Sequence, residues 1–288
     1  MEPEYRFTRV TPSAANIAEH IALLKICFPD STIFSPEYLR WLYGENPAGD
    51  VVGFDAWLGD ALAATYVTIP AKFVVFGEPV IGLLSLNTAT HPDHRGKRLF
   101  PRLADATIGA AKESGFEFIY GVANANSIGG FVKKLEFQDV IGLSARVGLG
   151  VAKPKMDVQP EDVDFHRHWD ADSLAWRIRN PANPLSLTEG KDGWTASGPS
   201  TKAGIRATAF LPSTLVEGDI NESGSSGISP LAVTLSTVPK GPYRGLNREL
   251  PQKLRPSPLR LIYRDLTGQR RTLDSARVHL TMLAFDAF

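Results

Sequence analysis

The stretch THPDHRGKRLFPRL, residues 90–103, decides how the first half of this chain folds. It joins an apolar run typical of a β-strand, VIGLLSLNTAT at 80–90, to a run with apolar residues at helical spacing from 100 to 113. Between the two runs lies a short basic turn, Arg95–Arg98, with one glycine. A strand that ends in such a turn presents unpaired backbone N–H groups at the start of a helix, which favours binding of an anion such as phosphate.

Helix and strand patterns continue on both sides of this turn. The segments 14–28, 36–43, 100–113 and 126–137 have helical spacing or helix caps, and strand patterns occupy 51–58, 61–76, 80–90, 116–122 and 140–151. This order predicts a mixed α/β (α+β) domain, in which helices flank a largely antiparallel sheet. Its ligand site is expected where the strand meets the basic turn.

A boundary is predicted in the middle of the chain, because proline and charge interrupt the apolar pattern at 151–164. We therefore expect a domain at 1–154 and a second at 155–288. The second contains a weak copy of the first, since EYLRWLYGENPAG at 37–49 is similar to DSLAWRIRNPANP at 172–184. We read it as a diverged copy, with strands and a short helix at 246–254.

Composition limits the possible partners. The 288 residues hold 31 Lys plus Arg and 31 Asp plus Glu, so no broad positive field is available for a nucleic acid. No apolar run is long enough to span a membrane, and the first residues lack the pattern of a secretory signal, so we expect a cytoplasmic protein. The single cysteine, Cys27, rules out an internal disulfide and a cysteine zinc cluster, and no metal is expected.

The stretch 84–137 resembles the GNAT superfamily of acyl-CoA-dependent N-acetyltransferases. In that family a strand ends in the pattern Val-x-Pro-x-x-Arg-Gly-x-Gly, a helix and a strand follow, and an Asn precedes a helix that ends in a Lys-Leu-Gly-Phe-like sequence. The counterparts here are Thr90, Pro92, Arg95, Gly96, Asn124, Asn126, Lys134, Leu135 and Phe137. The resemblance covers about residues 5–150, and YLRWLYGENPAG is similar to a segment of two-domain members, which implies the tandem form.

The resemblance implies which residues bind acetyl-CoA. Backbone groups of Thr88, Ala89 and Thr90 would bind the pantetheine arm as a further strand would. The pyrophosphate would be held by amides of Arg95, Gly96, Lys97, Arg98, Leu99 and Phe100. The far side of the cofactor would be lined by Asn124 or Asn126, with Phe131 and Lys133. The implied chemistry is direct attack of a neutral amine on the thioester, with a backbone N–H stabilising the oxyanion.

The chain departs from the family pattern at three positions. Arg98 replaces a glycine, Phe100 replaces a residue that is commonly small, and Val132 stands where the family often has the tyrosine that protonates the thiolate. Ser127 and Tyr120 are therefore the alternative acids.

The strand at 80–90 contains no carboxylate or histidine to act as a base. Asp30, Glu37 and the terminal carboxylate of Phe288 are the candidate bases, while His91 and His94 read as residues of a solvated turn. Asp30, Trp41 and Tyr43 are the candidates for contact with the acceptor.

The sequence therefore predicts an N-acetyltransferase that moves an acetyl group from acetyl-CoA to a primary amine of a small molecule, such as an amino sugar or an amino acid. The second domain would shape the acceptor site or a homodimer interface. Three alternatives stay open: an inactive acyl-CoA sensor, a tandem enzyme that uses aminoacyl-tRNA, and a structural domain without a ligand. The neutral charge argues against the tRNA alternative.

Overall fold

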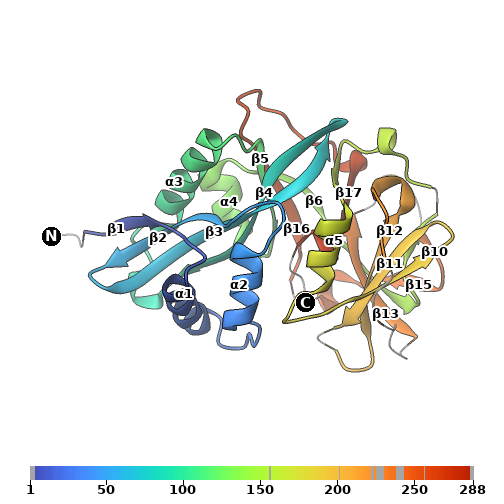
Figure 1. Cartoon of the computed structure of the whole chain (residues 1–288), viewed down its shortest axis with the longest axis horizontal. Helices are drawn as coiled ribbons and strands as arrows, with labels where there is room; N and C mark the ends of the chain where they lie inside the picture. The colour runs from blue at the N-terminus through green and yellow to red at the C-terminus, as the bar shows by residue number, and fades with distance from the viewer. Residues whose placement is uncertain are drawn as a thin grey trace.

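The computed structural model describes residues 4–155, 157–200, 202–221, 224, 230–237, 243–255 and 257–285. Within them the fold is mixed α/β, with five α-helices around one large mixed sheet of fifteen strands. The sheet runs through two lobes, one formed mostly by the N-terminal half of the chain and the other mostly by the C-terminal half (Figure 1). The predicted fold class is confirmed.

The first half of the chain forms elements close to those that the sequence predicts. α1 begins at Ala14 because the Ser13 side chain accepts a hydrogen bond from the Asn16 amide, and Ser35 caps α2 in the same way at Tyr38. The elements are β1 (Arg6–Arg9), α1 (Ala14–Cys27), α2 (Pro36–Gly44), β2 (Val52–Leu58), β3 (Ala61–Val75), β4 (Glu78–Thr90), α3 (Leu99–Glu113), β5 (Phe118–Ala123), α4 (Ile128–Leu135), β6 (Gln138–Gly142) and β7 (Ser144–Leu149).

The second half of the chain is mostly β-strand. Its main elements are β9 (Phe165–Arg167), α5 (Ala171–Ile178), β10 (Ser186–Gly190), β11 (Gly193–Pro199), β12 (Arg206–Pro212), β13 (Leu231–Thr237), β15 (Asn247–Glu249), β16 (Arg260–Asp265) and β17 (Val278–Thr281). The short strands β8 (Lys153–Pro154) and β14 (Tyr243–Arg244) pair separately. The helix expected at 246–254 is wrong, because β15 and a 3₁₀ turn at Gln252–Leu254 occupy that segment.

The lobes exchange strands. The predicted strand at 140–151 is two strands, of which β6 stays in the first lobe while β7 pairs with β13 of the second. In return, β16 from late in the chain lies between β5 and β6. The proposed boundary at 154/155 therefore divides the sequence, but each lobe contains one strand from the other part of the sequence: β16 in the first lobe and β7 in the second.

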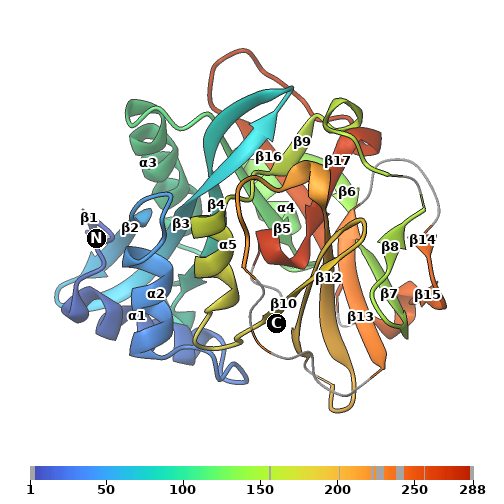
Figure 2. The same cartoon turned by 45° about the vertical axis from the view of Figure 1, so that its right-hand side comes forward.

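Helices α2 and α5 lie side by side where the lobes meet (Figures 1 and 2). They carry the two similar segments of the sequence, and their tryptophans stack with ring centroids 4.5 Å apart. The indole N–H of Trp41 donates to the backbone carbonyl of Trp176 at 3.1 Å, and the indole N–H of Trp176 donates to the backbone carbonyl of Trp41 at 3.2 Å. Reciprocal contacts of this kind are what a local two-fold axis produces, as expected if the second half is a copy of the first.

Candidate functional site

The strands β4 and β5 separate at the centre of the first lobe. They are parallel and pair only at Leu83 with Ile119 and at Leu84 with Tyr120. On its other edge β4 stays paired with β3 as far as Thr90. Beyond Leu84, then, no described strand pairs with the β5-facing edge of β4. An open edge of this kind can hydrogen-bond an extended ligand as an added strand, and the predicted residues Thr88, Ala89 and Thr90 lie along it.

A β-bulge interrupts β4 inside this opening. Between Leu86 and Ala89 the strand contains one residue more than its partner β3, and Asn87 has a positive φ of 44°. The Asn87 side chain donates to the Tyr43 hydroxyl at 3.2 Å. Such a bulge changes the direction of backbone groups at a ligand site, and here a side chain from α2 supports it.

Tyr43 connects the bulge to a buried polar pair that the sequence did not reveal. Its hydroxyl lies 3.2 Å from Nδ1 of His20, and Nε2 of His20 lies 2.9 Å from a carboxylate oxygen of Asp55. The other oxygen of Asp55 accepts from Asn16 at 2.8 Å. All three of His20, Asp55 and Tyr43 are fully buried. No spacing signal could have found this chain of bonds, because it joins three separate elements.

The basic turn follows β4 and leads into α3. Gly96 has φ +77°, and an added Cβ would meet no atom within 4 Å, so the space beside its backbone is open. Arg98 precedes α3 as its N-cap residue, with φ 56° and ψ 27°, and its side chain is exposed. The residue that replaces the family glycine thus keeps a glycine-like backbone. In the described part of the chain, no group accepts a hydrogen bond from the backbone amides of Gly96, Lys97 or Arg98. The backbone amides in the first turn of α3 also lack acceptors within the helix.

Substitution of Arg98 by glycine is expected to raise the free energy of unfolding by about 0.5–1 kcal/mol, because a side chain in the left-handed region is strained. Urea unfolding of the variant and of the native chain would measure this change. Matched substitution of Arg102, which lies inside α3, by glycine should destabilise the chain instead. A stability loss at Arg98 would show that its side chain makes stabilising contacts that exceed the strain.

Neighbouring side chains hold the turn in place. Nδ1 of His94 lies 2.8 Å from the Tyr5 hydroxyl, and Nδ1 of His91 accepts a bond from the Asp93 amide at 3.3 Å. The Cys27 thiol donates to the carbonyl of Thr90 at 3.4 Å. Burial raises the pKa of Cys27 although Arg95 opposes the shift, so the thiol stays protonated at neutral pH and is unsuited to act as a nucleophile.

The Asn-rich turn after β5 is held together by its own side chains. Oδ1 of Asn124 accepts from the amides of Asn126 and Ser127, and the Ser127 hydroxyl accepts from the Asn124 amide at 3.1 Å. Ser127 thus helps to form the turn that opens α4. On α4 itself, Lys133 is exposed, whereas Phe131 packs against Phe100 with ring centroids 5.3 Å apart. Phe131 therefore belongs to the core beneath α3, which limits its contact with a ligand.

Tyr120 lies where β4 and β5 separate, and its hydroxyl is engaged. It donates to the carbonyl of Ala284 at 2.5 Å, and burial raises its pKa to about 12. Protonation of a thiolate by Tyr120 would first require it to leave this acceptor. The contact also places the segment Met282–Phe285 at the opening between the strands. Phe288, the predicted base, lies outside the described residues.

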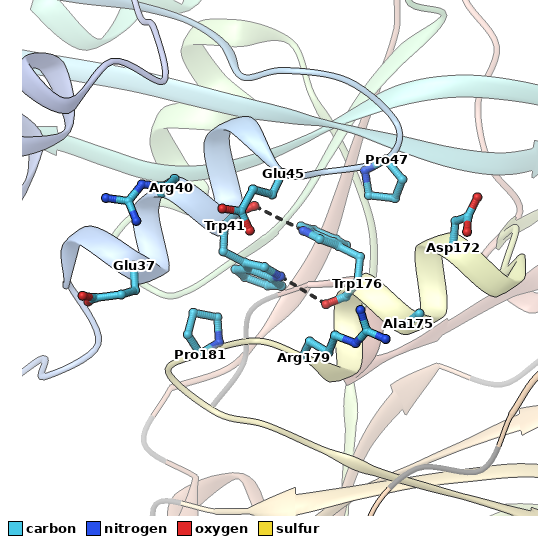
Figure 3. A pocket seen from close by; sticks show the side chains of 10 residues that line it. All are labelled: Glu37, Arg40, Trp41, Glu45, Pro47, Asp172, Ala175, Trp176, Arg179 and Pro181. Carbon is cyan, nitrogen blue, oxygen red and sulfur yellow. Dashed lines mark hydrogen bonds between the residues drawn. The ribbon is translucent and has the colours of Figure 1, made fainter.

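The remaining predicted residues lie on the side of α1 and α2. Asp30 is exposed, three residues beyond Cys27. Trp41 lines a pocket of about 550 Å³ between α2 and α5, together with Trp176 (Figure 3). Charged side chains of both signs surround the two stacked indoles there: Glu37, Arg40, Glu45, Asp172 and Arg179. Tyr43 is fully buried and lines no described pocket, so it supports the site from behind rather than as a wall.

The second lobe contains an opening like that of the first, but the chain itself fills it. β12 and β13 are parallel and pair only from Arg206 to Thr208. Next to them β17 pairs with β13, and the turn Met282–Ala284 that follows is buried against both strands. A pantetheine arm has no place there, and a 3₁₀ turn at Ser213–Leu215 follows β12 where α3 follows β4.

The described residues contain neither a helix that could span a membrane nor a cluster of metal ligands. No helix in them combines the length and the apolar character that crossing a bilayer requires. No three His, Cys, Asp or Glu side chains in the same residues lie together as ligands for a metal ion.

Residues 10–138 match the family described as acetyltransferase (GNAT) domain. No curated protein sequence matches the chain significantly.

Several solved structures are similar to most of the chain in fold. A probable N-acyltransferase of unknown function from Enterococcus faecalis V583 is 10% identical, with a TM-score of 0.59 over 93% of this chain and 74% of its own. A GCN5-related N-acetyltransferase from Anabaena variabilis ATCC 29413 is 14% identical, with a TM-score of 0.58 over 91% and 73%. Eis1 from Mycobacterium abscessus is 10% identical, with a TM-score of 0.52 over 74% and 60%. At these identities the likeness concerns the fold.

Proposed function

We propose that the chain transfers an acetyl group from acetyl-CoA to a primary amine of a small molecule, because residues 10–138 match the acetyltransferase (GNAT) domain family. One observation carries the proposal: the open edge of β4 runs directly into a turn whose amides have no described acceptor. An extended amide-rich arm followed by a pyrophosphate matches that order of groups. The residues present therefore fit acetyl-CoA.

Each part of the site would hold a different part of the donor. Backbone groups of Thr88, Ala89 and Thr90 would bind the pantetheine arm, and the amides from Arg95 to Phe100 would bind the pyrophosphate. The exposed side chain of Arg98 leaves the backbone of its turn accessible, so we propose that it adds a charge-assisted bond to a phosphate. Asn124, Asn126 and Lys133 would border the far side.

The chain contributes mainly binding and orientation to the chemistry. When bound, acetyl-CoA supplies an activated thioester. The acceptor amine would attack its carbonyl directly, and a backbone N–H of the β4 bulge would donate to the oxyanion. The hydrogen bonds from Asn87 through Tyr43 to His20 fix the bulge in position. Asp30 and the carboxylate of Phe288 stay our proposed bases, and Tyr120 and Ser127 our proposed acids.

The second lobe would shape the acceptor site. Its α5 forms one wall of the pocket in Figure 3, and its C-terminal segment reaches Tyr120. Both signs of charge line that pocket, which suits a small polar amine such as an amino sugar or an amino acid. We keep a cytoplasmic location and a homodimer as predictions.

A second candidate is a protein that binds acyl-CoA for regulation without turnover. Three observations favour it: Val132 replaces the usual tyrosine, the Ser127 hydroxyl is engaged in its turn, and the Tyr120 hydroxyl donates to a backbone carbonyl. Release of free thiol in the presence of a panel of small amines would separate the enzyme from the sensor.

The proposal is tested by calorimetric titration with acetyl-CoA. Substitution of Gly96 by glutamate should weaken binding at least 100-fold, about 2.7 kcal/mol, because a carboxylate would stand where a phosphate is expected. Glutamate at Gly109, which also faces open space but lies inside α3, is the matched control and should bind normally. Gly96→Ala is a second control, because it introduces the same backbone strain at position 96 without a negative charge. Absence of binding by the native chain would overturn the proposal.

A further inference from the structure

A small cavity lies where β4 and β5 separate. It has a volume of about 20 Å³ and is lined by Leu84 and Leu86 from β4 and by Tyr120 from β5. Leu84 and Tyr120 form the last pair between the two strands, and Leu86 directly precedes the bulge at Asn87. The cavity therefore adjoins the start of the open β4 edge, beside the bulge that is proposed to bind the thioester carbonyl.

Both lobes contribute to the lining of this cavity. Leu42 on α2 and Ala71 on β3 come from the first half of the chain, and Trp176 on α5 comes from the second. Two arginines of the second half, Arg167 and Arg177, also line it. All of these residues are buried except Trp176, which is partly exposed. Because packed interiors yield little, the size of the cavity is set by the side chains around it.

Trp176 also lines the larger pocket of about 550 Å³ between α2 and α5 (Figure 3). Among the residues that the structure describes, it is the one that borders both spaces, because Trp41 lines the outer pocket alone. Its indole is held in place by the stack on Trp41, at 4.5 Å between centroids, and by the bond that its N–H donates to the Trp41 carbonyl at 3.2 Å. Trp176 is therefore a fixed partition between the two spaces.

We propose that Trp176 determines acyl-chain specificity: it restricts the acyl group of the bound thioester to acetyl by separating the inner cavity from the outer pocket. The inner volume of about 20 Å³ accommodates about one water molecule, and a methyl group is of similar size. A longer acyl chain would have to displace packed side chains, which is unfavourable. The inference rests on the proposed function, because the thioester must bind beside the bulge.

The test is calorimetric titration of the full chain with free CoA, acetyl-CoA and butyryl-CoA, so no acceptor amine is needed. The native chain should bind acetyl-CoA about tenfold or more tightly than butyryl-CoA, because the longer chain overfills the cavity. Trp176→Ala joins the two spaces, and each further methylene that is then buried favours binding about fourfold. In this variant butyryl-CoA should bind at least as tightly as acetyl-CoA, while the affinity for free CoA stays unchanged.

Trp176→Leu is the second enlarging variant, and it decides the question if the alanine variant does not fold. Leucine keeps part of the packing but is smaller than the indole, so the preference for acetyl-CoA over butyryl-CoA should fall about threefold or more. Circular dichroism and the affinity for free CoA show in each case that the variant is folded. A general loss of structure would weaken all three ligands together, whereas an opened partition changes the ratio between two of them.

Trp41→Ala and Trp41→Leu are the matched controls. They remove the same stack and one of the two reciprocal indole bonds, but Trp41 does not line the inner cavity, so the native preference for acetyl-CoA should remain. The inference is overturned if the native chain binds acetyl-CoA and butyryl-CoA equally, if both Trp176 variants keep the native preference, or if the Trp41 variants lose it to the same extent. Failure of the native chain to bind even free CoA would instead overturn the proposed function, and this inference with it.

Discussion

Replacement of Trp41 by alanine is expected to lower the free energy of unfolding by about 3–5 kcal/mol, the range for a buried tryptophan. The side chain is almost fully buried, stacks on Trp176 and donates to its carbonyl. The variant would lose all three contributions and leave the Trp176 indole beside a cavity. Because the pair joins the lobes, unfolding of both should shift together in urea denaturation.

Trp57→Ala is the matched control for this prediction. Its indole N–H also donates to a side chain, Thr8 at 2.9 Å, but the ring is only half buried and lies within the first lobe. We expect a loss of about 1–2 kcal/mol there. A double-mutant cycle between Trp41 and Trp176 should give a coupling energy of about 1 kcal/mol. Simple additivity of the two substitutions would show that the stack does not stabilise the junction.

Acid should destabilise the chain through a pair of buried histidines. His166 on β9 and His279 on β17 are direct partners in the parallel pairing of these strands. Burial lowers the pKa of both, that of His279 to about 3, with a contribution from its neighbour. The folded chain therefore keeps His279 neutral, while the unfolded chain binds a proton near the ordinary value of 6.5.

The sign of the effect follows from this difference. Stability contributed by the neutral His279 is fully present above pH 6.5 and is lost as the pH falls from 6.5 toward 3. The loss is about 1.4 kcal/mol per pH unit, which reaches about 5 kcal/mol at pH 3. Urea unfolding between pH 7 and pH 4 would measure it. His279→Leu should reduce the slope, because one proton is no longer taken up on unfolding.

An unchanged slope in His279→Leu would mean that His279 gains no proton on unfolding in this range, and that acid lability has another origin.

Much of the fold could be predicted because its signals are local. Ser13 and Ser35 mark the starts of two helices through bonds to amides three residues ahead. The strand, basic turn and helix around Gly96 lie within a short stretch of the chain. The similarity of the segments around Trp41 and Trp176 indicated a second copy, and the reciprocal contacts of these tryptophans agree with it.

What only the tertiary structure decided depends on residues far apart in sequence. Strand exchange places β16 beside β5, about 140 residues earlier in the chain, and no local pattern specifies such a partner. His20 of α1 is bonded to Asp55 and Tyr43, which belong to two other elements. The guanidinium of Arg167 on β9 lies over the rings of Phe73 and Trp169. The sequence determined the elements and the basic turn through contacts between near neighbours. The tertiary structure decided which polar and charged side chains are buried, because the free-energy cost of an enclosed charge depends on which distant segments pack around it.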